Sequence, residues 1–215
     1  VDYYTAKGGA QETWEPVFTF HGFQHTALYV ESGTLSEAPS DKTLTAVVVH
    51  TDLPETASFD CSDPQLVRLH EAAGRTLLAG MHGLPMDCPV RERCGWLGDG
   101  HVIAEALLTR YDAASFLHKY ARDIETGGRR VTDEPRVGPN YGTIIREPKP
   151  AGIPHMIAPG KRRCNAASPD WGSAQVFIPW EICTQTGDVR ILQEFLEPMR
   201  TWIDYLGSIA DPRTG

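Results

Sequence analysis

Two kinds of hydrophobic pattern divide the chain near residue 57. Between residues 17 and 50, aromatic and β-branched side chains recur in short stretches that turn-forming residues separate, as is typical of β-strands. From residue 58 onward, apolar residues return at the spacing of an α-helix. The sequence therefore predicts the closing strands of a β-rich domain and a linker over residues 1–57, and a mainly helical domain over residues 58–215.

End signals refine the helical part. Asp63, followed by proline, and Asp112 are predicted N-caps, and Gly187 is a predicted C-terminal cap. We expect Pro198 to bend or divide the last helix. The predicted helices cover residues 64–77, 101–110, 113–124, 174–186 and 188–206.

Composition narrows the classes of partner. The chain has 20 Lys and Arg against 28 Asp and Glu, a formal net charge of −8, which argues against nucleic acid or an anionic membrane as partner. Its longest strongly apolar stretches are far shorter than a bilayer span. The five cysteines lack CxxC spacing, and HExxH, GxSxG and Gly-rich phosphate loops are absent. We therefore expect neither a metal nor another cofactor.

Residues 86–100 read MDCPVRERCGWLGDG and combine three carboxylates, Asp87, Glu92 and Asp99, with Trp96. One interpretation is a solvated charged loop. The other is a functional site, because a tryptophan is costly to expose. A carboxyl held against an indole ring also has its charged form disfavoured, which raises its pKa toward that of a general acid.

Alternation within Arg91-Glu92-Arg93 indicates which carboxyl would donate a proton. If this segment is extended, both arginines point to one side and Glu92 points to the other, into a pocket shared with Asp87 and Asp99. The two neighbouring charges would keep Glu92 protonated near neutral pH. Asp87 and Asp99 would stay ionised and accept hydrogen bonds from hydroxyl groups. A glycosidase has this layout, although other sites share it.

Asp170 and Trp171 form a second candidate site where a long Pro- and Gly-rich segment ends and a helix begins. Asp170 is either the N-cap of that helix or, with Trp171, part of a site where the indole stacks on a sugar. Trp180 and Trp202 lie on apolar helix faces and are predicted core residues. We expect the long segment at residues 125–170 to overhang the site.

The run from Met86 to Asp99 closely resembles the catalytic motif of bacterial α-L-rhamnosidases, glycoside hydrolase family 78. The resemblance spans about residues 17–206 and also rests on residues 18–23, 51–54, 59–64, 170–174 and 176–180. It implies a partial (α/α)₆ toroid of the six-hairpin glycosidase type, after a β-sandwich-like domain. The implied activity is hydrolysis of terminal α-L-rhamnosides with inversion.

The resemblance also implies roles for single residues. Glu92 matches the general acid, and Asp87 and Asp99 match carboxylates that hold rhamnose hydroxyls. Trp96 matches a ring that lines the sugar subsite. The remaining implied substrate-binding residues are Arg91, as an orienting residue, Asp170 and Trp171.

An inverting glycosidase needs a second carboxylate as general base, roughly 6.5–9.5 Å from the acid, and nothing after Asp188 resembles the family's motif for it. We therefore expect a fragment that carries the acid and is inactive alone. The expected partner is a rhamnose-containing glycoside or polysaccharide; compartment and oligomeric state stay open. Two alternatives remain: a related six-hairpin glycosidase for another sugar, and a non-catalytic carbohydrate-binding protein.

Overall fold

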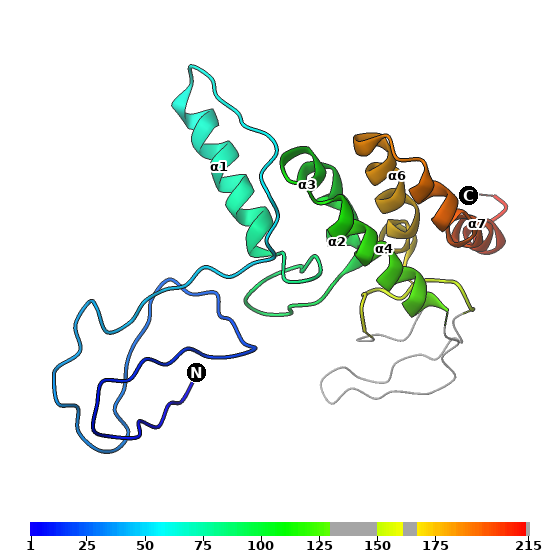
Figure 1. The fold of residues 1–215 in the computed structure, drawn as a ribbon. Helices are drawn as coiled ribbons and strands as arrows, with labels where there is room; N and C mark the ends of the chain where they lie inside the picture. The colour runs from blue at the N-terminus through cyan, green and yellow to red at the C-terminus, as the bar shows by residue number, and fades with distance from the viewer. Residues whose placement is uncertain (130–149, 161–166, 214–215) are drawn as a thin grey trace. The chain divides into compact units, whose positions relative to one another are not determined.

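A computed structural model describes residues 1–129, 150–160 and 167–213. The chain divides into two compact units, Val1–Val49 and His50–Gly215. All helices among the described residues belong to the second unit (Figure 1). They are α1 (Pro64–Ala79), α2 (Leu97–Val102), α3 (Ala104–Arg110), α4 (Ala114–Gly128), α5 (Pro169–Gly172), α6 (Ala174–Thr186) and α7 (Arg190–Ile209).

The first unit contains no strand among its described residues, although the pattern over residues 17–50 predicts strands. A strand exists through hydrogen bonds to a neighbouring strand, and residues 17–50 form no such ladder. Most of their apolar side chains remain exposed: Phe18 is fully exposed, and the exposed fractions are 83% for Tyr29 and 84% for Val48. The pattern thus shows the propensity for strands without the pairing that makes a sheet.

Helix α1 begins as predicted. The Asp63 carboxylate accepts a hydrogen bond from the Gln65 amide at 2.8 Å, which satisfies one of the donors left open at a helix start. Gly74 is the buried residue of this helix. The Arg110 guanidinium crosses Gly74 so closely that a Cβ there would lie 2.2 Å from its central carbon. Arg110 also donates to the His70 carbonyl, so this arginine ties α1 to the end of α3.

The helix predicted over residues 101–110 forms as two helices, α2 and α3, and begins at Leu97. The earlier start was not predicted because Gly98 and Gly100 weaken a helix in general. The prediction of Asp112 as the cap of α4 is wrong, since Ala113 is the N-cap and makes no side-chain bond there. The Asp112 amide donates instead to the Pro54 carbonyl at 2.9 Å.

Helices α6 and α7 meet at the predicted glycine cap. Gly187 has a φ of 74° and its amide donates to the Cys183 carbonyl at 2.8 Å, a conformation that a side chain disfavours. Pro198 lies inside α7, which continues as one helix through Ile209. The side-chain amide of Gln175 donates from Nε2 to the Pro198 carbonyl at 2.5 Å.

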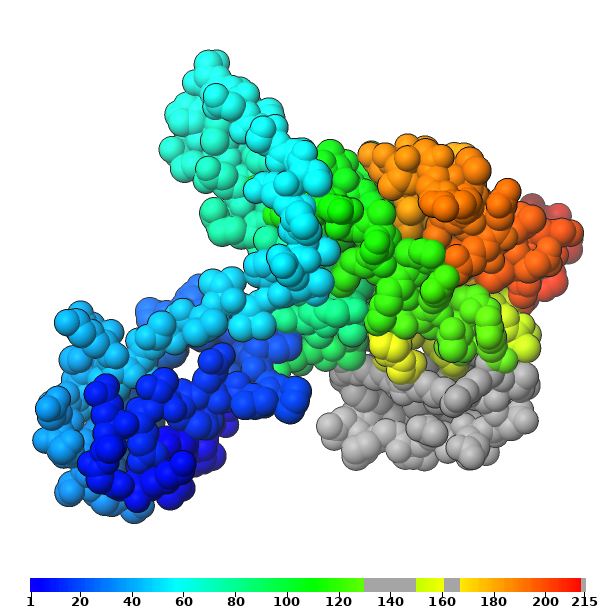
Figure 2. All heavy atoms as spheres, in the orientation of Figure 1, coloured from blue at the N-terminus to red at the C-terminus, as the bar shows by residue number. Residues whose placement is uncertain are grey.

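The core of the second unit forms around α6, which packs against α3, α4 and α7. At the surface, the green atoms of α3 and α4 lie beside the orange atoms of α6 and α7 (Figure 2). Trp202 is fully buried, as predicted, but Trp180 keeps 52% of its surface exposed, so its assignment to the core is wrong. Phe177, one turn earlier on α6, is also 46% exposed, although its ring lies 5.4 Å from that of His101 on α2. None of the described helices is long and apolar enough to cross a membrane.

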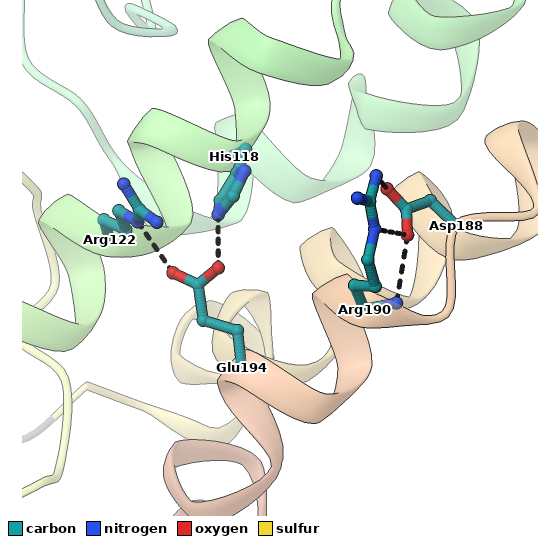
Figure 3. A network of polar contacts seen from close by, with 5 residues as sticks. All are labelled: His118, Arg122, Asp188, Arg190 and Glu194. Atoms are coloured by element: carbon teal, nitrogen blue, oxygen red, sulfur yellow. Dashed lines mark hydrogen bonds and ion pairs between the residues drawn. The ribbon is translucent and has the colours of Figure 1, made fainter.

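A polar network joins α4 to α7 at the surface (Figure 3). Glu194 of α7 accepts hydrogen bonds from His118 at 2.8 Å and Arg122 at 2.7 Å, both on α4. The hydrogen bond from Arg122 is the main reason that the pKa of Glu194 lies below its ordinary value. Beside it, hydrogen bonds from Arg190 lower the pKa of Asp188 to about 2. Glu194 thus links α4 to α7 at the surface.

Candidate active site

Hydrogen bonds close residues 87–94 into a loop. The Asp87 amide donates to the Cys94 carbonyl at 3.1 Å, and the Arg93 amide donates to the Cys88 carbonyl at 3.3 Å. The Asp87 carboxylate closes the loop again by accepting from the Cys94 amide at 2.9 Å. Arg93 takes a left-handed conformation with a φ of 54°. The loop therefore holds the Asp87 side chain in a fixed position by its own backbone.

A turn, and not an extended segment, places Glu92. Residues 89–92 form the turn, which the fixed φ of Pro89 favours, so the premise of an extended segment through Arg91 is wrong. Arg91 itself is exposed. Trp96 Nε1 donates to Glu92 Oε2 at 2.8 Å. The structure thus brings the candidate acid and the indole into direct contact.

Asp99 lies in the first turn of α2 and completes the carboxyl cluster. Burial raises the pKa of Asp99, and the charges of Asp87 and Glu92 raise it further. Since both charges act on Asp99, the three carboxyls lie within electrostatic reach of one another. The sequence predicted that Asp99 stays ionised, but its environment favours the protonated form more than water does.

The segment that carries Trp96 is anchored to residues 156–158. Trp96 pairs with Ile157 in an antiparallel bridge, and the Leu97 amide donates to the Met156 carbonyl at 3.0 Å. The two chains approach so closely that a Cβ at Gly95 would lie 1.9 Å from the carbonyl oxygen of Ala158. Glycine is therefore required at residue 95.

Tyr120 of α4 supports the same segment from below. Its ring is fully buried, and its hydroxyl donates to the Gly95 carbonyl at 2.9 Å. Burial raises the pKa of Tyr120, so the hydroxyl stays a donor. The sequence placed Tyr120 on the apolar face of a helix and did not identify this role, although a buried tyrosine hydroxyl normally finds a partner.

The second candidate pair lies beside α2. Ser168, and not Asp170, is the N-cap of α5, and a hydrogen bond from Ser168 is the main reason that the pKa of Asp170 is lowered. The Trp171 ring covers Gly98, where a Cβ would lie 2.6 Å from the ring. His101 Nε2 lies 2.8 Å from the Asp170 carbonyl oxygen. The structure thus joins the second pair to the helix that carries Asp99.

These contacts assemble segments that are far apart in the sequence. The loop at residues 87–94, α2, residues 156–158 and the start of α5 meet around Trp96 and Asp99. His101 was missed because it matched no motif of its own. The segment predicted to overhang the site covers residues 125–170. Most of it, namely residues 130–149 and 161–166, lies outside the described residues.

Two family profiles cover most of the chain. The bacterial alpha-L-rhamnosidase 6 hairpin glycosidase domain matches residues 54–212, and the bacterial alpha-L-rhamnosidase concanavalin-like domain matches residues 1–50. A curated alpha-L-rhamnosidase of Formosa agariphila is 40% identical over 197 residues, which are 92% of this chain and 19% of the relative. One of Streptomyces avermitilis is 34% identical over an alignment of 215 positions that covers 98% of this chain and 18% of the relative.

Solved structures agree with these matches. The alpha-L-rhamnosidase of Streptomyces avermitilis, complexed with L-rhamnose, has a TM-score of 0.63 and 27% identity over 75% of this chain and 14% of that one. The enzyme of Dictyoglumus thermophilum, at 24% identity, shares the fold with a TM-score of 0.68 over 81% of this chain and 18% of that one. The chain spans about a fifth of the length of the curated relatives. Since the helical profile alone covers residues 54–212, the chain belongs to the family of bacterial alpha-L-rhamnosidases with a six-hairpin glycosidase domain.

Proposed function

We propose that the cluster at residues 87–99 is the acid and sugar-binding part of an inverting α-L-rhamnosidase. One observation carries the proposal. The part of the chain that matches the six-hairpin glycosidase family contains a loop in which Glu92 contacts Trp96 and in which Asp87 and Glu92 act on Asp99. Several carboxyls around an aromatic ring suit the recognition of sugar hydroxyls and the protonation of a glycosidic oxygen.

In this proposal Glu92 is the general acid that protonates the leaving oxygen of a terminal α-L-rhamnoside. Asp87 and Asp99 accept hydrogen bonds from rhamnose hydroxyls, which the fixed position of Asp87 in the loop favours. Trp96 holds the Glu92 carboxyl and offers its ring to the sugar. Residues with supporting contacts to substrate are Trp171, Asp170 and Arg91.

The general base is a carboxylate outside this cluster, because inversion requires room for a water molecule between base and acid. We therefore propose that residues 58–215 supply part of the helical catalytic domain. Residues 1–57 supply the end of the preceding β-rich domain and a linker. On this proposal the chain alone hydrolyses rhamnosides little. The substrate is a rhamnose-containing glycoside or polysaccharide. The solved complex of the Streptomyces avermitilis relative with L-rhamnose supports this choice.

The test uses the polypeptide encoded by the whole reading frame and a panel of aryl glycosides. The proposal predicts hydrolysis of the α-L-rhamnoside, a loss of about 10²-fold or more in Glu92→Gln, and normal rates in Glu105→Gln, whose carboxylate is exposed on α3. Hydrolysis of another sugar alone would instead establish a related glycosidase. Binding of L-rhamnose without turnover would establish a carbohydrate-binding protein.

A further inference from the structure

We propose that Cys88 is a positioning residue whose thiol fixes the Glu92 backbone relative to the Asp87 carboxylate. Cys88 Sγ lies 2.8 Å from Asp87 Oδ2 and donates to it. The same sulfur accepts a hydrogen bond from the Glu92 amide at 3.1 Å. A single atom therefore connects the backbone of one member of the carboxyl cluster to the side chain of another.

A thiol suits this place because it is both a weak donor and a weak acceptor. The thiol donates its one proton in a hydrogen bond to the Asp87 carboxylate. A hydrogen bond to a charged group is stronger than one between neutral groups. Its lone pairs remain for the Glu92 amide. A cysteine that only filled space would behave as a small apolar group, whereas both polar contacts of the Cys88 thiol are with residues of the candidate site.

The backbone of the loop makes the sulfur effective. The Cys88 carbonyl accepts a hydrogen bond from the Arg93 amide. The Asp87 amide donates to the Cys94 carbonyl, and Asp87 Oδ1 accepts from the Cys94 amide. These bonds fix the base of the loop, while Glu92 lies at the end of the turn above it. The bond from the Glu92 amide to Cys88 Sγ spans the inside of the turn, so it limits how far Glu92 can move from Asp87.

The first test measures position without requiring activity. Hydrogen exchange of the Glu92 amide is followed by NMR in this chain, in Cys88→Ala, which removes donor and acceptor, and in Cys88→Ser, which retains both. We expect exchange to be about ten-fold faster in Cys88→Ala and close to the parent in Cys88→Ser. Cys183→Ala, which removes a half-buried thiol from α6, is the matched control and should leave the Glu92 amide unchanged. Parent-like exchange in Cys88→Ala would overturn the proposal.

The second test concerns catalysis and rests on the proposed function. In the polypeptide from the whole reading frame, we expect Cys88→Ala to lower kcat about ten-fold or more through misplacement of Glu92, with a smaller change in KM and partial rescue in Cys88→Ser. Unchanged kcat and pH profile in an active Cys88→Ala enzyme would overturn the proposal. If the unsubstituted polypeptide hydrolyses no rhamnoside, the proposed function fails, and the exchange of the Glu92 amide alone decides whether Cys88 positions it.

Discussion

Replacing Tyr120 by phenylalanine removes one hydroxyl group from the support of the site. That hydroxyl donates to the Gly95 carbonyl at 2.9 Å. The Gly95 carbonyl keeps a second donor, the Ala158 amide, at 2.9 Å, so Tyr120→Phe leaves this buried acceptor with a partner. The free energy of unfolding should therefore fall by the net value of one hydrogen bond, about 0.5–1.5 kcal/mol, and not by the larger penalty of an unsatisfied group.

Urea unfolding followed by tryptophan fluorescence measures this difference. We expect a lower midpoint with an unchanged slope, which indicates a change in stability alone. Tyr120→Ala also removes the buried ring and should cost ~3–5 kcal/mol. Tyr205→Phe is the matched control, since Tyr205 is a half-buried tyrosine of α7 whose ring lies 5.7 Å from that of Trp202. It should change stability by less than about 0.5 kcal/mol.

Two results would refute this reasoning. A loss in Tyr120→Phe as large as that in Tyr120→Ala would mean that the hydroxyl, and not the ring, dominates the packing of α4 against the loop. A loss no greater than that in Tyr205→Phe would mean that the hydrogen bond from the Tyr120 hydroxyl to the Gly95 carbonyl contributes nothing to stability. Either result would remove Tyr120 from the account of how the segment under Trp96 is held.

Three further predictions concern the site and its surroundings. Gly98→Ala should displace the Trp171 ring and lower stability in calorimetry by ~1–3 kcal/mol, whereas Gly127→Ala on α4, where nothing lies within 4 Å, should raise it by roughly 0.5–1 kcal/mol. Asp99→Asn should stabilise the fold near neutral pH, because the raised pKa of Asp99 means that its charged form destabilises the folded state. This gain in stability should vanish as the pH falls below the ordinary pKa of aspartate. A gain that persists at acid pH would contradict this cause. Glu194→Gln should destabilise slightly at neutral pH, because this pKa is lowered and the pair is at the surface; the difference in urea midpoint should shrink as the pH falls through the lowered value.

Local physics made several elements predictable. Asp63 before a proline and Gly187 after a periodic run are end signals that depend on a few neighbouring residues, and both act as caps in the structure. The carboxyl cluster could also be predicted from the sequence, because Asp87, Glu92 and Asp99 lie within one short segment. What the sequence could indicate was therefore the content of the site and the ends of two helices.

Other features depend on contacts between distant segments. The start of α2 at Leu97 was not predicted, because glycine disfavours a helix in general. In the structure, Gly98 is within the helix and its lack of a side chain leaves room for the Trp171 ring. Trp180 was assigned to the core from its helix face alone, but burial depends on what packs against that face. The strands predicted over residues 17–50 do not form among the described residues, since pairing requires a partner strand. Periodicity indicates which side chains can be buried, and only tertiary contacts decide which are.

If Glu92 is the general acid, the effect of removing its carboxyl group on the rate must depend on the leaving group. In the polypeptide from the whole reading frame, kcat is measured for Glu92→Gln and the parent with an activated aryl α-L-rhamnoside and with an alkyl α-L-rhamnoside, whose leaving group needs a proton. The account predicts a loss of about 10²-fold or more with the alkyl substrate and a much smaller loss with the activated one. Near-parental hydrolysis of the alkyl rhamnoside by Glu92→Gln would contradict it.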